Sequence, residues 1–168
     1  TSTGAVLDTR TITAFSTGQY LVWTIGGHVT FRVTNTGAMN AVVSGLFFDP
    51  VGSSPPPPKT TAAFVRTDTS TQGNWLGAYG SNGYGLANMS AALPSYAQVA
   101  WAGQQSWTWA ASTTDPRALW QPAGGDRTAA TWYSGSSFTI DVNITDGATH
   151  QVALYNVDWD FANTRAQR

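Results

Sequence analysis

The chain has 168 residues, a net charge of −1 and a charged content of 10%, against about 25% in average soluble proteins. It has no glutamate and one lysine, Lys59, so it lacks the basic patch that nucleic-acid binding needs. It has no cysteine and no run of about 18 apolar residues, which excludes a disulfide framework, thiolate metal sites and membrane insertion.

The first 50 residues are predicted to form β-strands joined by tight turns. Val29, Phe31 and Val33 alternate with polar residues, which is the pattern of a strand with one buried face. The dipeptide Gly26-Gly27 predicts a hairpin that joins this strand to the one before it, and Asn35-Thr36-Gly37 predicts a further turn. The other strands expected here are Ala5–Thr13, Gln19–Ile25 and Ala41–Phe48.

A proline-rich segment, residues 51–61, follows these strands. Its four consecutive prolines, Pro55 to Pro58, favour extended polyproline II and supply no backbone donors. A 50-residue segment rarely buries enough apolar surface to fold alone without disulfides or metal. We therefore expect residues 1–50 and 62–168 to be two parts of one sandwich fold, completed either within one chain or between chains.

The second segment is also predicted to be rich in strands. Phe138, Ile140, Val142 and Ile144 alternate with polar residues, and Asp146-Gly147 predicts a hairpin after them. A helical turn or two is expected at residues 87–93. The remaining strands expected are Ala62–Thr67, Gln98–Ala100, Ser106–Ala110, Arg127–Tyr133 and Gln151–Trp159. Many short strands with glycine- and threonine-rich turns indicate an all-β protein, an antiparallel β-sandwich or jelly roll.

Several stretches resemble a known kind of module. They are Asp68–Tyr84, Asp126–Tyr133, Leu154–Asp160, Val6–Ile12, Gly18–Trp23 and Gly27–Val33. Together they resemble a β-sandwich module that is repeated or appended in large secreted bacterial proteins and is related in architecture to carbohydrate-binding modules. In that pattern the Asp68 segment comes first and the Gly45–Phe48 strand closes the domain. Here the order is reversed, so the resemblance implies a circularly permuted module from a secreted or cell-surface protein.

Exposed aromatic side chains are the predicted binding residues. A flat tryptophan or tyrosine ring stacks on the apolar face of a sugar, although buried aromatics also dominate protein cores. The chain has eight tryptophans. We expect Tyr79, Tyr84, Trp101 and Trp120 to be exposed and to bind carbohydrate, because they lie in glycine-rich or turn-like contexts.

Five of the other tryptophans divide into two groups. Trp107 and Trp109 are two residues apart, so on a strand their side chains share one face. Trp75, Trp132 and Trp159 lie in strand-like motifs and are expected in the core. Between residues 67 and 106, aromatic side chains are interleaved with glycines at positions 73, 77, 80, 83 and 85, and this stretch is either a ligand-binding loop or a connection fixed to the core.

Two aspartates near the end of the chain offer a weak calcium site. Asp158 and Asp160 are two residues apart, and carboxylate oxygens are ligands that calcium takes. The alternative is that they pair with Arg165 or Arg127. No other cofactor is expected.

Catalytic motifs are lacking, and the chain is not expected to be an enzyme. Asp115 and Asp126 could serve as the two carboxylates of a glycosidase, but no nucleophile elbow, metalloprotease motif or phosphate-binding loop occurs. The predicted function is a non-catalytic extracellular module that binds polysaccharide or glycan. The alternative is a structural subunit that assembles with copies of itself, end to end, into a fibre by strand exchange between chains.

Overall fold

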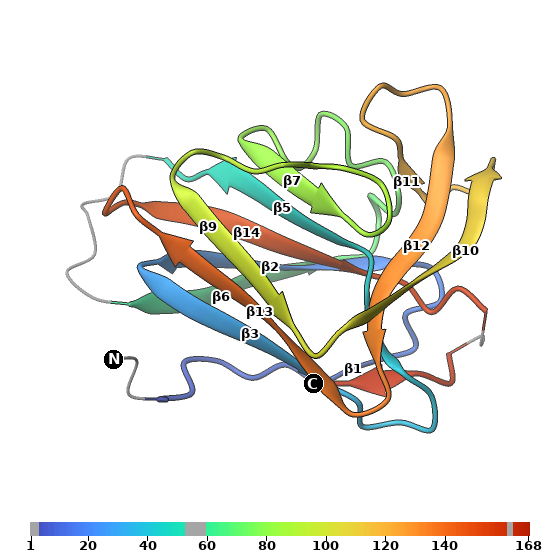
Figure 1. Cartoon of the computed structure of the whole chain (residues 1–168), viewed down its shortest axis with the longest axis horizontal. Helices are drawn as coiled ribbons and strands as arrows, with labels where there is room; N and C mark the ends of the chain where they lie inside the picture. The colour runs from blue at the N-terminus through green and yellow to red at the C-terminus, as the bar shows by residue number, and fades with distance from the viewer. Residues whose placement is uncertain (1–3, 53–59, 161–162) are drawn as a thin grey trace.

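The computed structural model describes residues 4–52, 60–160 and 163–168, and the predicted proline segment lies mostly outside them. The described residues form an all-β fold (Figure 1). Its strands are β1 (Ile12–Thr13), β2 (Gln19–Gly26), β3 (His28–Thr34), β4 (Ala41–Val43), β5 (Gly45–Pro50), β6 (Thr61–Asp68), β7 (Gly83–Leu86), β8 (Ala91–Ala92), β9 (Ala97–Ala102), β10 (Gln105–Thr113), β11 (Leu119–Trp120), β12 (Arg127–Ser134), β13 (Ser137–Ile144), β14 (Thr149–Asn156) and β15 (Ala166–Gln167).

The strands pair antiparallel in sheets that pack face to face, which confirms the predicted β-sandwich. The largest sheet has the order β6-β2-β14-β5-β7-β8. A three-stranded sheet, β3-β13-β9, lies across it in Figure 1. In the third sheet β12 pairs with β10 on one side and with β11 and β4 on the other, and β1 pairs with β15. Within the described residues, no helix has the length and apolarity needed to cross a bilayer.

Two hydrophobic clusters cover the two faces of the large sheet. Along β2, Leu21, Trp23 and Ile25 face the interior of the sandwich, whereas Tyr20 and Val22 face a second cluster on the outer side. This second cluster includes Trp75, Tyr79 and Leu119 from the connections. Because both faces of β2 are covered, Tyr20 to Trp23 form a continuous apolar run rather than an alternating pattern.

Two predicted hairpins are wrong, because each turn joins different sheets. Gly26-Gly27 leads from β2 in the large sheet to β3 in the small one, and Asp146-Gly147 leads from β13 to β14 in the opposite direction. The two corners are neighbours, since Ile144 N donates a hydrogen bond to Gly27 O (2.9 Å). A turn signal in the sequence specifies a reversal of the chain, but it does not specify which sheet the chain enters next.

Other predicted elements also need correction. Of the strand expected at residues 5–13, only Ile12–Thr13 pairs with another strand. The strand expected at residues 41–48 is divided at Ser44, and its halves β4 and β5 join different sheets. The helical turn expected at residues 87–93 is a turn with Asn88 at φ 52°, followed by β8. The turn at Asn35 is confirmed, because its Oδ1 accepts a hydrogen bond from Gly37 N (3.1 Å).

The two segments flanking the proline run share all the sheets. Each of β1 to β5 pairs only with strands that follow the run, and the described pairings contain none between two strands of the first segment. The strand β14 has β2 on one side and β5 on the other, so both of its neighbours come from the first 50 residues.

Candidate functional site

An open groove lies against strands β10, β12 and β4, and aromatic rings form much of its surface. Its volume is about 300 Å³. The residues that line it are Met39, Asn40, Val42, Trp107, Trp109, Thr131, Tyr133, Asp160 and Arg165. They come from the beginning, middle and end of the chain, and the sheet brings them together because β12 pairs with β10 on one edge and β4 on the other.

The two tryptophans of β10 share this groove, as their spacing predicts. Trp107 lies opposite Thr131 of β12, and a shift in register follows Thr108. The side chain of Trp107 is 57% exposed, whereas Trp109 is partly buried. A largely exposed tryptophan is uncommon in a folded domain, because its ring forgoes a large burial energy.

Polar and aromatic groups fix the orientation of Trp109. Its Nε1 donates a hydrogen bond to Asp160 Oδ2 (3.0 Å). The Trp159 ring stacks on it with centroids 6.4 Å apart and planes 20° apart. The Arg165 guanidinium lies 5.6 Å from the centre of the Trp109 ring. These contacts hold the indole in one position, so the groove is formed before any ligand arrives.

The two aspartates considered for calcium both bind Arg165. Its Nη1 lies 2.5 Å from Asp158 Oδ1 and 2.6 Å from Asp160 Oδ1, and Asp158 is fully buried. This is the ion pairing that the sequence offered as the alternative to a metal site. Across the described part of the chain, no group of three or more His, Cys, Asp or Glu side chains is placed to hold a metal ion.

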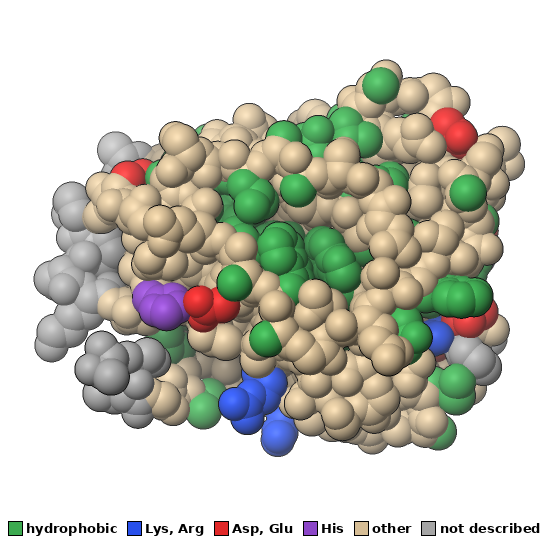
Figure 2. All heavy atoms as spheres, viewed as in Figure 1, with side chains coloured by type: hydrophobic (Ala, Val, Ile, Leu, Met, Phe, Trp, Pro, Cys, Tyr) green, Lys and Arg blue, Asp and Glu red, His purple; other side chains and the backbone are tan. Residues whose placement is uncertain are grey.

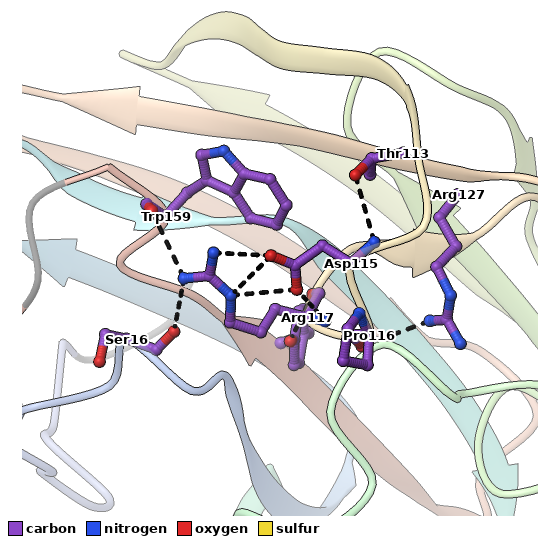
Figure 3. Close-up of polar contacts among 8 residues, drawn as sticks. Ser16, Thr113, Asp115, Pro116, Arg117, Arg127 and Trp159 are labelled. Carbon is purple, nitrogen blue, oxygen red and sulfur yellow. Dashed lines mark hydrogen bonds and ion pairs between the residues drawn. The ribbon is translucent and has the colours of Figure 1, made fainter.

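A second arginine, Arg117, lies against Trp159 (Figure 3). Arg117 pairs with Asp115 (Nη2 to Oδ2, 2.8 Å), and its Nη1 donates to Ser16 O (3.1 Å) and Trp159 O (3.4 Å). Its guanidinium lies 4.5 Å from the centre of the Trp159 ring. The Arg117 hydrogen bond is the main cause that lowers the pKa of Asp115, which keeps this carboxylate ionised. The network ties Trp159, and through it Trp109, to two distant loops.

The predicted exposure of Tyr79 is wrong. Its side chain is 3% exposed and stacks on Tyr20 with centroids 4.2 Å apart. Its hydroxyl donates to Asp68 Oδ2 (2.8 Å) and accepts from Arg66 Nη2 (3.3 Å). Burial, and then the bond to Asp68, raise the pKa of Tyr79 to about 12. Glycines beside Tyr79 let the connection fold tightly onto the sheet, so the ring becomes part of the outer cluster.

The other three predicted residues are partly exposed, and they lie apart from the groove residues. Trp101 of β9 contacts Trp132 of β12, with centroids 5.4 Å apart. Trp120 is covered on one face by the Arg127 guanidinium, 3.9 Å from its ring centre. Tyr84 of β7 packs against Trp75 and lines a separate cavity. Their predicted role in carbohydrate binding stays a prediction.

That separate cavity lies beneath the glycine-rich connection and has a volume of about 410 Å³. Asp49 at the end of β5 accepts hydrogen bonds from Gly80 N (3.0 Å) and Ser81 N (2.8 Å). Trp75 and Tyr84 form its aromatic side. The connection is thus fixed to the core by Trp75 and Tyr79, and the same arrangement leaves a second hollow beside it.

In comparisons with family models, curated proteins and solved structures, nothing matches the chain. Sequence reasoning identified the shared face of Trp107 and Trp109 but did not identify Trp107 as the exposed ring. Asn40 and Tyr133 carried no signal of their own, since only the pairing of β4 with β12 places them here.

Proposed function

We propose that this chain is a non-catalytic module that binds polysaccharide or glycan outside the cell, through the groove along β10, β12 and β4. The observation that carries the proposal is the exposed ring of Trp107 beside the fixed ring of Trp109. Two aromatic rings in one groove suit a chain of sugar units, because a ring covers the apolar face of a pyranose.

Polar groups beside the rings are placed to form hydrogen bonds with the hydroxyls of a sugar. Asn40 brings an amide, Thr131 and Tyr133 bring hydroxyls, and Asp160 brings a carboxylate that is partly exposed. Ligand sites typically combine an apolar surface with a few fixed polar groups, which provide orientation and specificity. The low charge of the chain and its polar, uncharged surface residues are consistent with an extracellular protein.

Affinity electrophoresis in gels that contain plant or microbial polysaccharides tests the proposal. We expect at least one polysaccharide to retard the protein and Trp107→Ala to weaken that binding about tenfold, or about 1.4 kcal/mol. Trp107→Phe should retain most of the affinity, because it preserves a stacking face.

Val65→Ala is the matched control for loss of an exposed apolar side chain. Val65 is 48% exposed and lies on β6, outside both cavities. Its loss should leave the retardation unchanged. If no polysaccharide retards the native chain, or if Trp107→Ala binds as the native chain does, the proposed function is wrong.

A further inference from the structure

The first segment (residues 1–50) completes the sheets of the second (residues 62–168), and its described strands form no sheet of their own. Every described pairing of β1 to β5 is made with a strand beyond the proline run, so residues 1–50 contain strands but no sheet. The second segment, in contrast, has internal pairings, such as β13 with β9 and β12 with β10.

Each segment is incomplete without the other. The first segment supplies Trp23, Phe47 and Phe48, which are 7%, 0% and 0% exposed in the whole fold. Without that segment, both edges of β14 lose their partners, and its backbone donors and acceptors would be left unpaired in an apolar setting. The pairing itself does not depend on whether the two segments belong to the same polypeptide.

The covalent connection is long enough for either arrangement. Pro50 and Ala62 are separated by His150 and Ile25 in the sheet, which is three strand spacings or about 14 Å. The eleven intervening residues have a maximum reach of about 40 Å. The same chain length can therefore return the segment to its own sheet or carry it to that of a neighbour.

We infer that copies of this chain exchange their first segments, so that residues 1–50 of one copy complete the sheets of another. The contacts between two exchanged chains are then the strand pairings already described within one chain. Exchange therefore needs no additional stabilising contact. Such exchange is a low-cost route to oligomers, and a head-to-tail arrangement gives rings or filaments. Higher protein concentration favours it, because closure within one chain does not depend on concentration.

Exchange would also divide the groove between two polypeptides. Asn40 and Val42 come from the first segment, whereas Trp107 and Trp109 come from the second. In an exchanged assembly each groove is thus completed by a neighbour. This consequence rests on the proposed carbohydrate function, but the exchange itself does not.

The absence of cysteine makes the exchange directly measurable. Arg32 of β3 and Thr139 of β13 are directly paired across the two segments, at a separation that a disulfide can bridge. The double variant Arg32→Cys/Thr139→Cys would be unfolded, refolded at micromolar and at near-millimolar concentration, oxidised, and run on a denaturing gel without reductant. We expect a monomer band at low concentration and a ladder of covalent dimers and larger species at high concentration.

A second pair within residues 62–168 is the matched control. Gln98 of β9 and Asn143 of β13 are paired directly, and their side chains lie 3.2 Å apart. The variant Gln98→Cys/Asn143→Cys should give a monomer band at every concentration. A monomer band for both variants throughout, or a ladder for both, would overturn the inference. This readout needs no sugar, so it separates failure of the exchange from failure of the proposed function.

Discussion

Along one side of the sandwich, between the edge strands β6 and β3, the chain covers its aromatic side chains. Along the other side, between β7 and β9, it leaves them partly open. On the first side, Trp23 meets Phe31 and Phe64, and the N-terminal segment closes over them. Asp8 Oδ2 accepts a hydrogen bond from Trp23 Nε1 (2.9 Å), and the Arg10 guanidinium lies 3.8 Å from the Phe64 ring centre.

The other side lacks such a cover within the described residues. Trp101, Trp132 and Leu93 converge over Gly85 of β7, and all three are partly exposed. Figure 2 shows hydrophobic side chains gathered in a hollow in the middle of this face, over the space between β9 and β12. Residues 4–11, which pair with no other strand, thus cover the first side of the sandwich through an ion pair, a hydrogen bond and a ring contact.

The largest difference between the two sides should appear when the central tryptophan of each is removed. Trp23→Ala should cost about 3–5 kcal/mol of the free energy of unfolding, because the buried indole leaves a cavity. Trp101→Ala should cost about 1–2 kcal/mol, since solvent already reaches that ring. Urea unfolding measures both, and equal losses would show that the two sides are equally packed.

Deleting residues 1–10 tests the cover itself. We expect a loss of about 1–2 kcal/mol in the free energy of unfolding and increased binding of the dye ANS, because Trp23 and Phe64 become exposed. The control is Val6→Ser/Leu7→Ser in the full chain. These side chains are 81% and 47% exposed, so the change should alter stability by less than about 0.5 kcal/mol. A deletion as harmless as this control would contradict the covering role.

The ion pair of the cover predicts a dependence on pH. The hydrogen bond from Arg10 is the largest cause that lowers the pKa of Asp8, and burial opposes it. The folded state therefore binds this proton less well than the unfolded chain. Asp8 stabilises the fold above its ordinary pKa of about 4, and that contribution is lost as pH falls through the lowered pKa. Asp8→Asn should reduce stability by less than about 1 kcal/mol at pH 7 and by less still at pH 3, which thermal unfolding at both pH values measures.

The smallest effect is expected on the open side, at Gly85. A methyl group there would lie 3.7 Å from Trp101 and 3.8 Å from Trp132, which is ordinary contact. Gly85→Ala should therefore change the free energy of unfolding by less than about 0.5 kcal/mol. For comparison, Gly27 has φ +69°, and a methyl group added there would lie 3.2 Å from the Cα of Thr60, so Gly27→Ala should be clearly destabilising. Similar losses for the two variants would mean that the open side is as tightly packed as the corner.

The sequence predicts the strands better than it predicts their partners. Alternation identifies β13 correctly, because Phe138 to Ile144 place every second side chain in the core. Local patterns cannot show that the Gly26-Gly27 turn changes sheets, because that depends on strands more than 100 residues away. The candidate groove has the same limit. Asn40, Trp107 and Asp160 are far apart in the chain, and only the completed sheets bring them together.

The pairing of β14 with two strands from the first 50 residues has a consequence for the order of events during synthesis. As the chain leaves the ribosome, β2 and β5 must wait for about 100 further residues before β14 exists to receive them. Contacts between residues so far apart in sequence give the protein a high contact order, which slows folding. Folding of the large sheet therefore finishes only after Asn156 has emerged. Until then, the apolar strands of the nascent chain are exposed to pairing with the wrong neighbours.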